Sequence, residues 1–248
     1  MDKPKERVGI VMAGPKLFTS RLIVLDGLPG SGKSMTGEWL TAQLREHESN
    51  ACWLPETKVS HPLWWYDHWN GTEYQTPDFE NVPIEKYLQS SLAKWKVFTK
   101  LMRTSGQRYV AESVFFQNAV AMFLTGGARP ATLVEYAQEV QGITRSIDPV
   151  LIYFRQNDAD AALRRICAVR GRAFEEELIS NMERFPYLQK RELKGLDGVS
   201  RLWLNIATIT DSLFEEYILP KLAIEISAGN WQSYRQQILE FLGLPTHL

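Results

Sequence analysis

The 248-residue sequence has few cysteines and no long hydrophobic run. Its two cysteines, Cys52 and Cys167, are far apart and belong to no Cys-x-x-Cys or Cys/His pattern. This spacing argues against a disulfide framework or a zinc site and favours two reduced, packed thiols. No stretch reaches the ~18 apolar residues of a membrane-spanning helix. The apolar stretch near the N-terminus is too short for a secretory signal, so we expect a cytoplasmic protein without a membrane partner.

The sequence also lacks an excess of charge of either sign. It contains 28 basic and 29 acidic residues, with a formal net charge of -1 and a pI near 6.5. Such a balance provides no general attraction to nucleic acid, so we expect no nucleic-acid partner, and any anion must be bound locally. The 44% of hydrophobic residues and 23% of charged residues are ordinary for a globular protein with a large core.

Short apolar runs alternate with longer segments of helical periodicity, which predicts an α/β fold with a parallel sheet. We expect one domain over residues 20–248, preceded by an N-terminal extension over 1–19. Residues 57–83 lack clear periodicity and are typical of a binding loop. The expected strands are 22–25, 51–54, 109–111, 150–154 and 222–226. The expected helices are 33–47, 84–104, 116–124, 131–142, 158–169, 173–193, 203–217 and 230–242.

A glycine-rich motif follows the first apolar run. The segment Gly27–Ser34 matches G-x-x-x-x-G-K-[ST], placed between a strand and a helix start. Glycines let backbone N–H groups approach phosphate oxygens, and the helix N-terminus favours negative charge. Lys33 is expected to reach the β- and γ-phosphates of ATP, and Ser34 to bind Mg²⁺. The expected phosphate-binding residues are Gly27, Leu28, Pro29, Gly30, Ser31, Gly32, Lys33 and Ser34.

Two carboxylates follow strands beside this loop. Glu112 comes at the end of the third apolar run and Glu56 just after the second, where parallel sheets present functional residues. We interpret Glu112 as a Mg²⁺-binding or proton-accepting residue and Glu56 as a candidate general base. A helix-capping role for Glu112 and an ordinary loop position for Glu56 are the alternatives.

Four arginines lie within nine residues after the fourth apolar run. Their planar guanidinium groups suit a phosphate chain, and Arg165 and Arg172 share one face if the helix continues that far. The alternative is a solvated basic helix paired with the acidic residues 175–177. We expect catalytic roles for Arg164 and Arg170, and nucleotide-binding roles for Arg165 and Arg172.

Together these motifs resemble the P-loop small-molecule kinases, which include thymidylate kinase, other nucleoside monophosphate kinases and deoxynucleoside kinases. The resemblance spans most of residues 21–243. It implies the P-loop NTPase fold, a five-stranded parallel sheet flanked by helices, with an arginine-bearing helical lid. Segments Glu56–Pro62, Glu112–Asn118 and Asp148–Phe154 resemble a poorly characterised branch of these kinases, and that likeness implies no particular substrate.

The sequence departs from these kinases at one informative place. Thymidylate kinases have an Asp-Arg-Tyr-like triplet, and deoxynucleoside kinases a Glu-Arg-Ser, where this chain has Glu112-Ser113-Val114. The missing arginine leaves recognition of an acceptor phosphate in doubt. The sequence also lacks the Asn-Lys-x-Asp base reader of GTPases and a strand ending in Asp-Glu, which argues against switches and motors.

Aromatic residues crowd the irregular stretch after Glu56. The cluster contains Trp64, Trp65, Tyr66, His68 and Trp69. It predicts walls for a flat or sugar-like acceptor, with Trp65 and a histidine in contact, or else a segment packed on the core. The expected acceptor-binding residues are Glu56, His61, Trp65, Gln117, Asn118 and Tyr187.

The combined pattern predicts an enzyme, a P-loop kinase that uses ATP and Mg²⁺. It would transfer the γ-phosphoryl group to a small-molecule acceptor, with a hydroxyl as the favoured acceptor group. A nucleoside or nucleotide kinase is one alternative. A regulatory ATP-binding protein without a small-molecule acceptor is another, because a phosphate loop by itself indicates binding and no particular reaction. The pattern is compatible with a homodimer.

Overall fold

The computed structural model describes residues 20–47, 50–66 and 75–245. Its centre is a sheet of five parallel strands in the order β2-β3-β1-β4-β5. The α/β class and the five-stranded parallel sheet flanked by helices are thereby confirmed. The strands are β1 (Leu22–Gly27), β2 (Ala51–Leu54), β3 (Arg108–Glu112), β4 (Val150–Arg155) and β5 (Lys221–Glu225).

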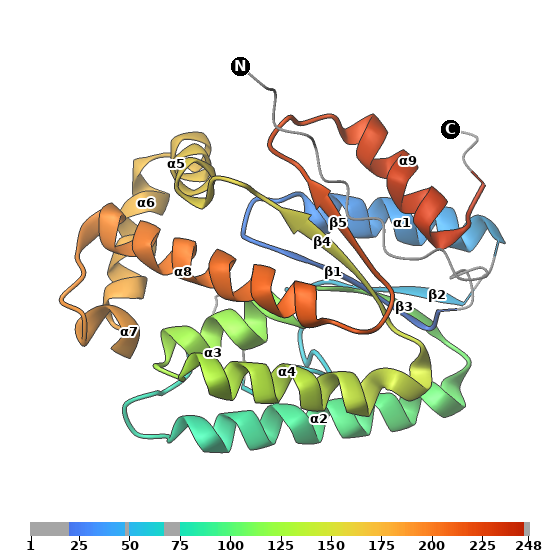
Figure 1. Cartoon of the computed structure of the whole chain (residues 1–248), viewed down its shortest axis with the longest axis horizontal. Coiled ribbons are helices and arrows are strands. Elements are labelled where there is room, and N and C mark those ends of the chain that lie inside the picture. Colours follow the sequence, from blue (N-terminus) through green and yellow to red (C-terminus); the bar gives the residue numbers. More distant parts are fainter. Residues whose placement is uncertain (1–19, 48–49, 67–74, 246–248) are drawn as a thin grey trace.

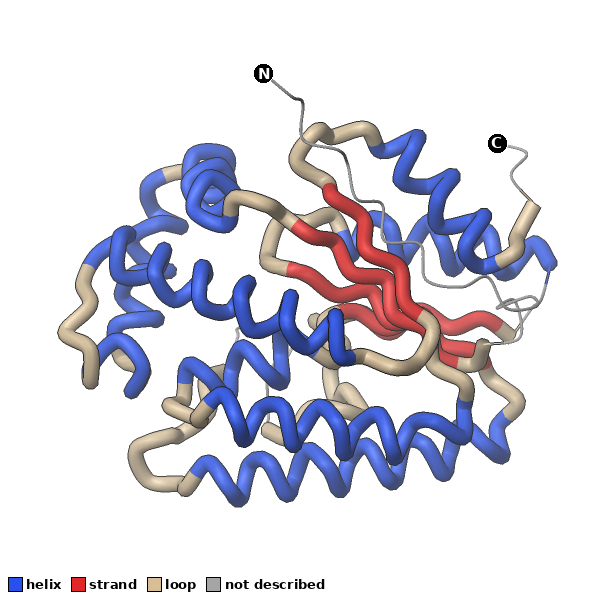
Figure 2. The backbone as a smooth tube through the Cα atoms, in the orientation of Figure 1, coloured by secondary structure: helices blue, strands red, loops and turns tan. Residues whose placement is uncertain are grey.

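Helices cover both faces of the sheet, so the protein has three layers (Figures 1 and 2). One face carries α1 (Lys33–His47) and α9 (Trp231–Leu242). The opposite face carries α2 (Ile84–Ser105), the π-helix η2 (Phe116–Ala121), α3 (Met122–Thr125), α4 (Pro130–Thr144), the short 3-10 helix η3 (Arg145–Ile147) and α8 (Gly195–Glu216). Near one end of α8 lie α5 (Ala159–Arg170), α6 (Arg172–Glu183) and α7 (Pro186–Gln189).

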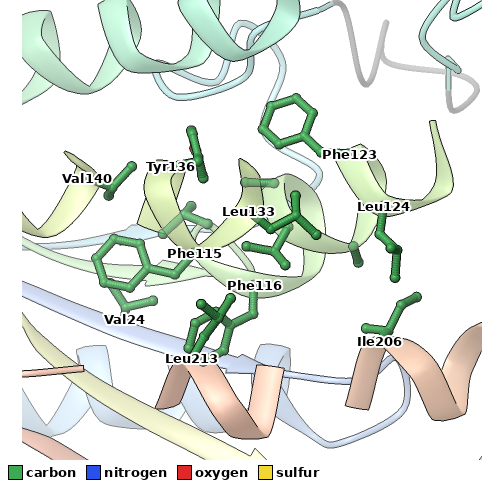
Figure 3. Packing of buried hydrophobic residues seen from close by; sticks show 14 of the residues in the cluster. Val24, Phe115, Phe116, Phe123, Leu124, Leu133, Tyr136, Val140, Ile206 and Leu213 are labelled. Carbon is green, nitrogen blue, oxygen red and sulfur yellow. The ribbon is translucent and has the colours of Figure 1, made fainter. Parts of the chain in front are cut away.

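Successive residues of each strand pack into different hydrophobic clusters. Val24 and Tyr153 belong to the cluster beneath the α2, α4 and α8 layer, whereas Leu25 and Phe154 belong to the cluster beneath α1 and α9. This alternation follows from the two-residue period of a strand, and burial on both faces explains the nearly continuous apolar runs. Figure 3 shows part of the first cluster, in which Phe116 of η2 and Leu213 of α8 are labelled.

Helix boundaries differ from the sequence expectation at three places. The expected helix 173–193 is two helices, because Pro186 stands at the start of α7 and cannot continue the preceding helix. The helix expected from 203 begins at Gly195. Its first turn contains two glycines, which have a low helix propensity, so the sequence did not predict this start. The segment 116–124 begins as a π-helix, which side-chain periodicity does not reveal. No helix in the described part of the chain is long and apolar enough to cross a membrane.

Candidate phosphate and acceptor site

The turn between β1 and α1 is closed by glycines that no other residue could replace without strain. A Cβ on Gly27 would lie 2.5 Å from the carbonyl oxygen of Phe154. Gly32 has a φ of +78°, and its Cβ would lie 2.2 Å from the ring of Trp231. The left-handed backbone and these close approaches explain the glycines of the motif and give a tight loop at the N-terminus of α1.

Lys33 folds its side chain back into this loop. Its ammonium donates hydrogen bonds to the carbonyl oxygens of Gly27 and Leu28, both at 3.0 Å, and to the Ser31 hydroxyl at 3.3 Å. The side chain is buried, and this burial lowers the pKa of Lys33, although nearby carboxylates oppose the shift. A buried cation is therefore held at the centre of the turn.

Ser34, Glu112 and Glu56 form a chain of hydrogen bonds beside the loop. The Ser34 hydroxyl donates to Oε1 of Glu112 at 2.6 Å, and the backbone N–H of Glu56 donates to Oε2 of the same carboxylate at 3.3 Å. The amide of Gln117 donates to Oε2 of Glu56 at 3.3 Å, and the Trp64 indole donates to the carbonyl oxygen of Glu56 at 3.0 Å. The structure thus brings together both carboxylates predicted from the sequence.

The environment of Glu112 disfavours its charged form. Burial raises the pKa of its carboxyl, and the hydrogen bond from Ser34 opposes this shift. The nearby Glu56 raises the pKa further, while Lys33 lowers it. A carboxyl whose pKa is shifted by burial and by nearby charges is a common feature of functional sites.

Asp26 is a residue of the site that our sequence analysis missed. It is fully buried at the end of β1, and its two carboxylate oxygens accept the backbone N–H groups of Gly27, Phe115, Phe116 and Gln117 at 2.8–3.0 Å. Burial raises its pKa, while these hydrogen bonds and Lys33 oppose the rise. The carboxylate therefore fixes the backbone that carries Gln117, whose amide contacts Glu56. Its position directly before the glycine motif was the only signal in the sequence.

Helix α5 lies against the phosphate loop. The side chain of Ile166 would be only 3.0 Å from a Cβ on Gly30. The next residue after this helix, Gly171, has a φ of +87° and separates α5 from α6. The sequence placed Arg165 and Arg172 on one helical face only if the helix continued through both residues. The break at Gly171 interrupts the helix, so the two arginines do not share one continuous face.

The four predicted arginines all lie on the exposed side of these helices. Arg164 pairs with Asp160 and Asp197, and the Arg172 guanidinium donates to a carboxylate one turn along α6 at 2.7 Å. The guanidinium of Arg170 lies 4.8 Å from the ring centre of a phenylalanine in α6. Surface ion pairs of this kind are weak. Because the arginines are exposed, they are free to exchange these partners for a phosphate.

The predicted aromatic contacts are in the core. Trp65 is buried, with its ring centre 4.6 Å from that of Phe123. His61 is buried and stacks on Trp64 at 4.5 Å. The Tyr187 hydroxyl accepts a hydrogen bond from the amide of Asn205. His68 and Trp69 lie outside the described residues, as does the extension 1–19.

A cavity of about 210 Å³ adjoins the phosphate loop. The predicted acceptor residues Glu56, Gln117 and Asn118 line it, together with the loop segment Gly27–Pro29. His61, Trp65 and Tyr187 do not line it. Most of the remaining wall comes from apolar side chains of η2, α3, α6 and α8. Polar groups therefore gather at the loop end, and an apolar chamber extends from them.

The described residues contain no group of three or more histidine, cysteine, aspartate or glutamate side chains arranged to hold a metal ion. A metal at this site would therefore depend on fewer protein ligands, as magnesium commonly does when phosphates and waters complete its shell. The hydroxyl of Ser34 and the carboxylate of Glu112 are oxygen ligands of the suitable type.

Comparisons with known proteins agree with this architecture. No protein-family model matches the sequence, and no curated protein sequence matches it. Among solved structures, thymidylate kinase from Ehrlichia chaffeensis is similar with a TM-score of 0.51 and 9% identity over 91% of this chain and 99% of that chain. The YorR protein from Bacillus subtilis, in complex with phosphorylated GDP, has a TM-score of 0.47 and 10% identity over 92% of this chain and 98% of that chain. The strand order, the glycine loop and the similarity to the first structure show that this chain has the fold of P-loop kinases.

Proposed function

We propose that the protein is an ATP- and Mg²⁺-dependent phosphotransferase that acts on a hydroxyl of a small molecule. One observation carries the proposal: the cavity opens against the loop Gly27–Pro29, and Glu56, which is hydrogen-bonded to Glu112 and Gln117, lines the same cavity. A phosphoryl donor in the loop and an acceptor in the cavity would meet beside a proton acceptor. That arrangement suits group transfer better than simple nucleotide binding.

The loop fits the phosphates of ATP. Its glycines allow backbone N–H groups to approach phosphate oxygens, and the first N–H groups of α1 have no partner within that helix. The ammonium of Lys33 now donates to loop carbonyls, and the same group would donate to phosphate oxygens instead. Lys33 thereby provides the fixed positive charge that the transferred phosphoryl group requires.

Ser34 and Glu112 would hold Mg²⁺. Their oxygen atoms are 2.6 Å apart, at the start of α1 and the end of β3. Mg²⁺ bound there would neutralise phosphate charge, as in other phosphoryl-transfer enzymes. Burial raises the pKa of Glu112, and a bound cation would lower it and favour the carboxylate form.

Glu56 is the favoured proton acceptor because it lines the cavity, whereas Glu112 is bound to the Ser34 hydroxyl. Hydrogen bonds from Gln117 and Trp64 fix its position. In the proposed reaction a bond forms between the acceptor oxygen and the γ-phosphorus, and the bond to the β–γ bridging oxygen breaks. The hydroxyl proton passes to Glu56, and ADP leaves with the bridging oxygen.

The arginines of α5 and α6 would bind the phosphate chain from the side of the loop on which α5 packs. Contact between Ile166 and Gly30 places α5 next to the loop, and Arg164, Arg165, Arg170 and Arg172 are exposed on this pair of helices. A small movement about Gly171 would turn part of the set toward the loop. Such closure would add positive charge and exclude water.

The decisive test is Mg²⁺-dependent ATP turnover against a library of small alcohols, nucleosides and sugars. We expect one class of acceptor to stimulate turnover. Lys33→Ala should lower that turnover by about 10²-fold or more, as the loss of a transition-state donor does in other enzymes. Lys96→Ala is the matched control, because Lys96 is exposed on α2 away from the loop, and its turnover should equal that of the parent protein.

Tight ATP binding without stimulation by any acceptor would overturn the phosphotransferase assignment and favour a regulatory ATP-binding protein. Equal activity of the parent and the Lys33→Ala variant would show that the loop does not act on the transferred group.

A further inference from the structure

The cavity beside the phosphate loop is mainly apolar. Its lining residues come mainly from the loop, η2, α3, α6 and α8. Figure 1 labels the helices α3, α6 and α8. Two of its walls come from η2, which ends at Ala121, and α8, which begins at Gly195, so the chamber exists only in the folded chain. The apolar side chains that define it include Phe116, Met122, Leu178, Met182, Trp203 and Ile206.

The lining carries no positive charge. All of its residues are described, and they include one carboxylate, that of Glu56, but no lysine or arginine. A phosphate group in this chamber would lose its hydration without gaining a cation from the lining residues, and Glu56 would repel it. The arginine that thymidylate kinase-like sequences have after the third strand is replaced here by Ser113. The chamber is therefore unsuited to a nucleoside monophosphate.

One polar group beside the chamber has no hydrogen-bond partner among the described residues. Asn118 is 4% exposed and lines the cavity, and its amide Nδ2 makes no hydrogen bond within the described part of the chain. Buried amides are nearly always paired, so this one requires an explanation. The other polar pair in the wall, Tyr153 and Thr210, is satisfied by its mutual hydrogen bond of 3.0 Å. A rotation of the Asn118 side chain would bring this amide to the cavity surface, where an oxygen of a bound molecule would satisfy it.

The volume limits the size of the occupant. An apolar cavity of about 150 Å³ is known to hold a benzene molecule. The cavity here has about 210 Å³ and therefore holds one ring with a short side arm. Its polar end lies at the phosphate loop, where Glu56 and Gln117 meet. A hydroxyl on the side arm would lie at that end, with the ring among the helices.

We propose that the phosphoryl acceptor is an uncharged, largely apolar alcohol of about one ring in size, whose hydroxyl lies beside Glu56. This inference rests on the proposed function and narrows its substrate class. Asn118 contributes a hydrogen bond to an oxygen of the acceptor, and Ile206 and Trp203 contact its ring.

The test uses the full chain with benzyl alcohol, 2-phenylethanol and cyclohexylmethanol as probes. Benzyl phosphate, thymidine and thymidine monophosphate form the comparison set. Binding is measured by calorimetry, and phosphorylation with Mg²⁺ and ATP is followed by phosphorus NMR. We expect saturable binding and phosphorylation of at least one neutral alcohol probe, with no phosphorylation of the comparison set.

Two variants locate the site. Ile206→Trp fills the chamber and should weaken binding of the alcohol by at least about tenfold, the effect of losing one good contact. Leu204→Trp is the matched control, because Leu204 lies on the same helix but is 45% exposed, and its binding should be unchanged. Asn118→Ala should weaken binding by about tenfold without enlarging any side chain, so it tests the site even where the tryptophan variant fails to fold.

The outcomes separate the two proposals. Phosphorylation of thymidine or thymidine monophosphate but of no neutral alcohol probe would overturn the acceptor class and leave the phosphotransferase function intact. Binding of an alcohol probe without phosphorylation of any compound would overturn the phosphotransferase function and the acceptor role together. Binding of no alcohol probe, or equal binding by the Ile206→Trp and Leu204→Trp variants, would overturn the assignment of the cavity.

Discussion

Replacing Asp26 with alanine is expected to cost several kcal/mol of unfolding free energy. Its carboxylate accepts the backbone N–H of Gly27 and those of residues 115–117. A donor left unsatisfied costs about 1–3 kcal/mol, so four donors at about 1.5 kcal/mol each amount to about 6 kcal/mol. Removing a buried carboxyl returns about 2 kcal/mol of desolvation cost. The expected net loss is about 4 kcal/mol.

Urea unfolding followed by circular dichroism measures this loss. With a slope of about 2–3 kcal/mol per molar urea, the midpoint of Asp26→Ala should fall by about 1.3–2 M. Asp211→Ala is the matched control, because Asp211 pairs with Arg155 at 2.7 Å where both side chains are 30–40% exposed. Its loss should not exceed about 1 kcal/mol. Equal midpoints for the two variants would refute the role assigned to Asp26.

Three further predictions concern the loop and the lid. Burial raises the pKa of Glu112 above its ordinary 4.5, so the unfolded chain releases this proton first and stability falls as pH rises through that value. Glu112→Gln should remove this fall, and its stability relative to the parent should increase as the pH rises above 4.5 in urea titrations. Gly32→Ala should lose about 2–4 kcal/mol in the same assay, since its φ of +78° and the ring of Trp231 both oppose a Cβ. Arg172→Ala should change stability by less than about 0.5 kcal/mol, because the arginine and Glu176 are 90% and 63% exposed.

Each of these predictions has its own control. A parallel pH dependence for the parent and Glu112→Gln would contradict the raised pKa. Adding Trp231→Ala to Gly32→Ala should recover the steric part of the loss and leave about 1–2 kcal/mol from the backbone, and no recovery would place the strain elsewhere. For Arg172→Ala, an increased KM for ATP with unchanged stability would support its proposed contact with the phosphate chain, whereas an unchanged KM would argue against it.

The fold could be predicted because its signals are local. The strand β1 and the turn into α1 are contiguous in sequence, and each requires only apolar residues, glycines and Lys33 at fixed spacing. The other strands appear as short apolar runs because helices cover both faces of the sheet. The burial of the strands on both faces therefore made them recognisable as apolar runs in the sequence.

The rest of the site depends on contacts between distant segments. Asp26 stands beside the glycine motif, but three of its four donors lie about ninety positions later, and no spacing rule connects them. The cavity walls likewise come from α3, α6 and α8. Trp65 could equally contact an acceptor or the core from its sequence alone, and only the packing against Phe123 places it in the core. Whether such a residue contacts a ligand or packs in the core is determined by the tertiary structure.

The alternation along β4 has a consequence for how specificity can vary. Tyr153 faces the cavity side of the sheet, while its neighbour Phe154 faces the other side, where its carbonyl oxygen closes against Gly27 and its ring approaches that of Trp231. If the proposed function holds, these two adjacent residues would influence different substrates of one reaction. Under the proposed function, substitutions of Tyr153 would alter the acceptor cavity while the loop beside Phe154 keeps its shape, so the two specificities could evolve independently although a single peptide bond joins these residues.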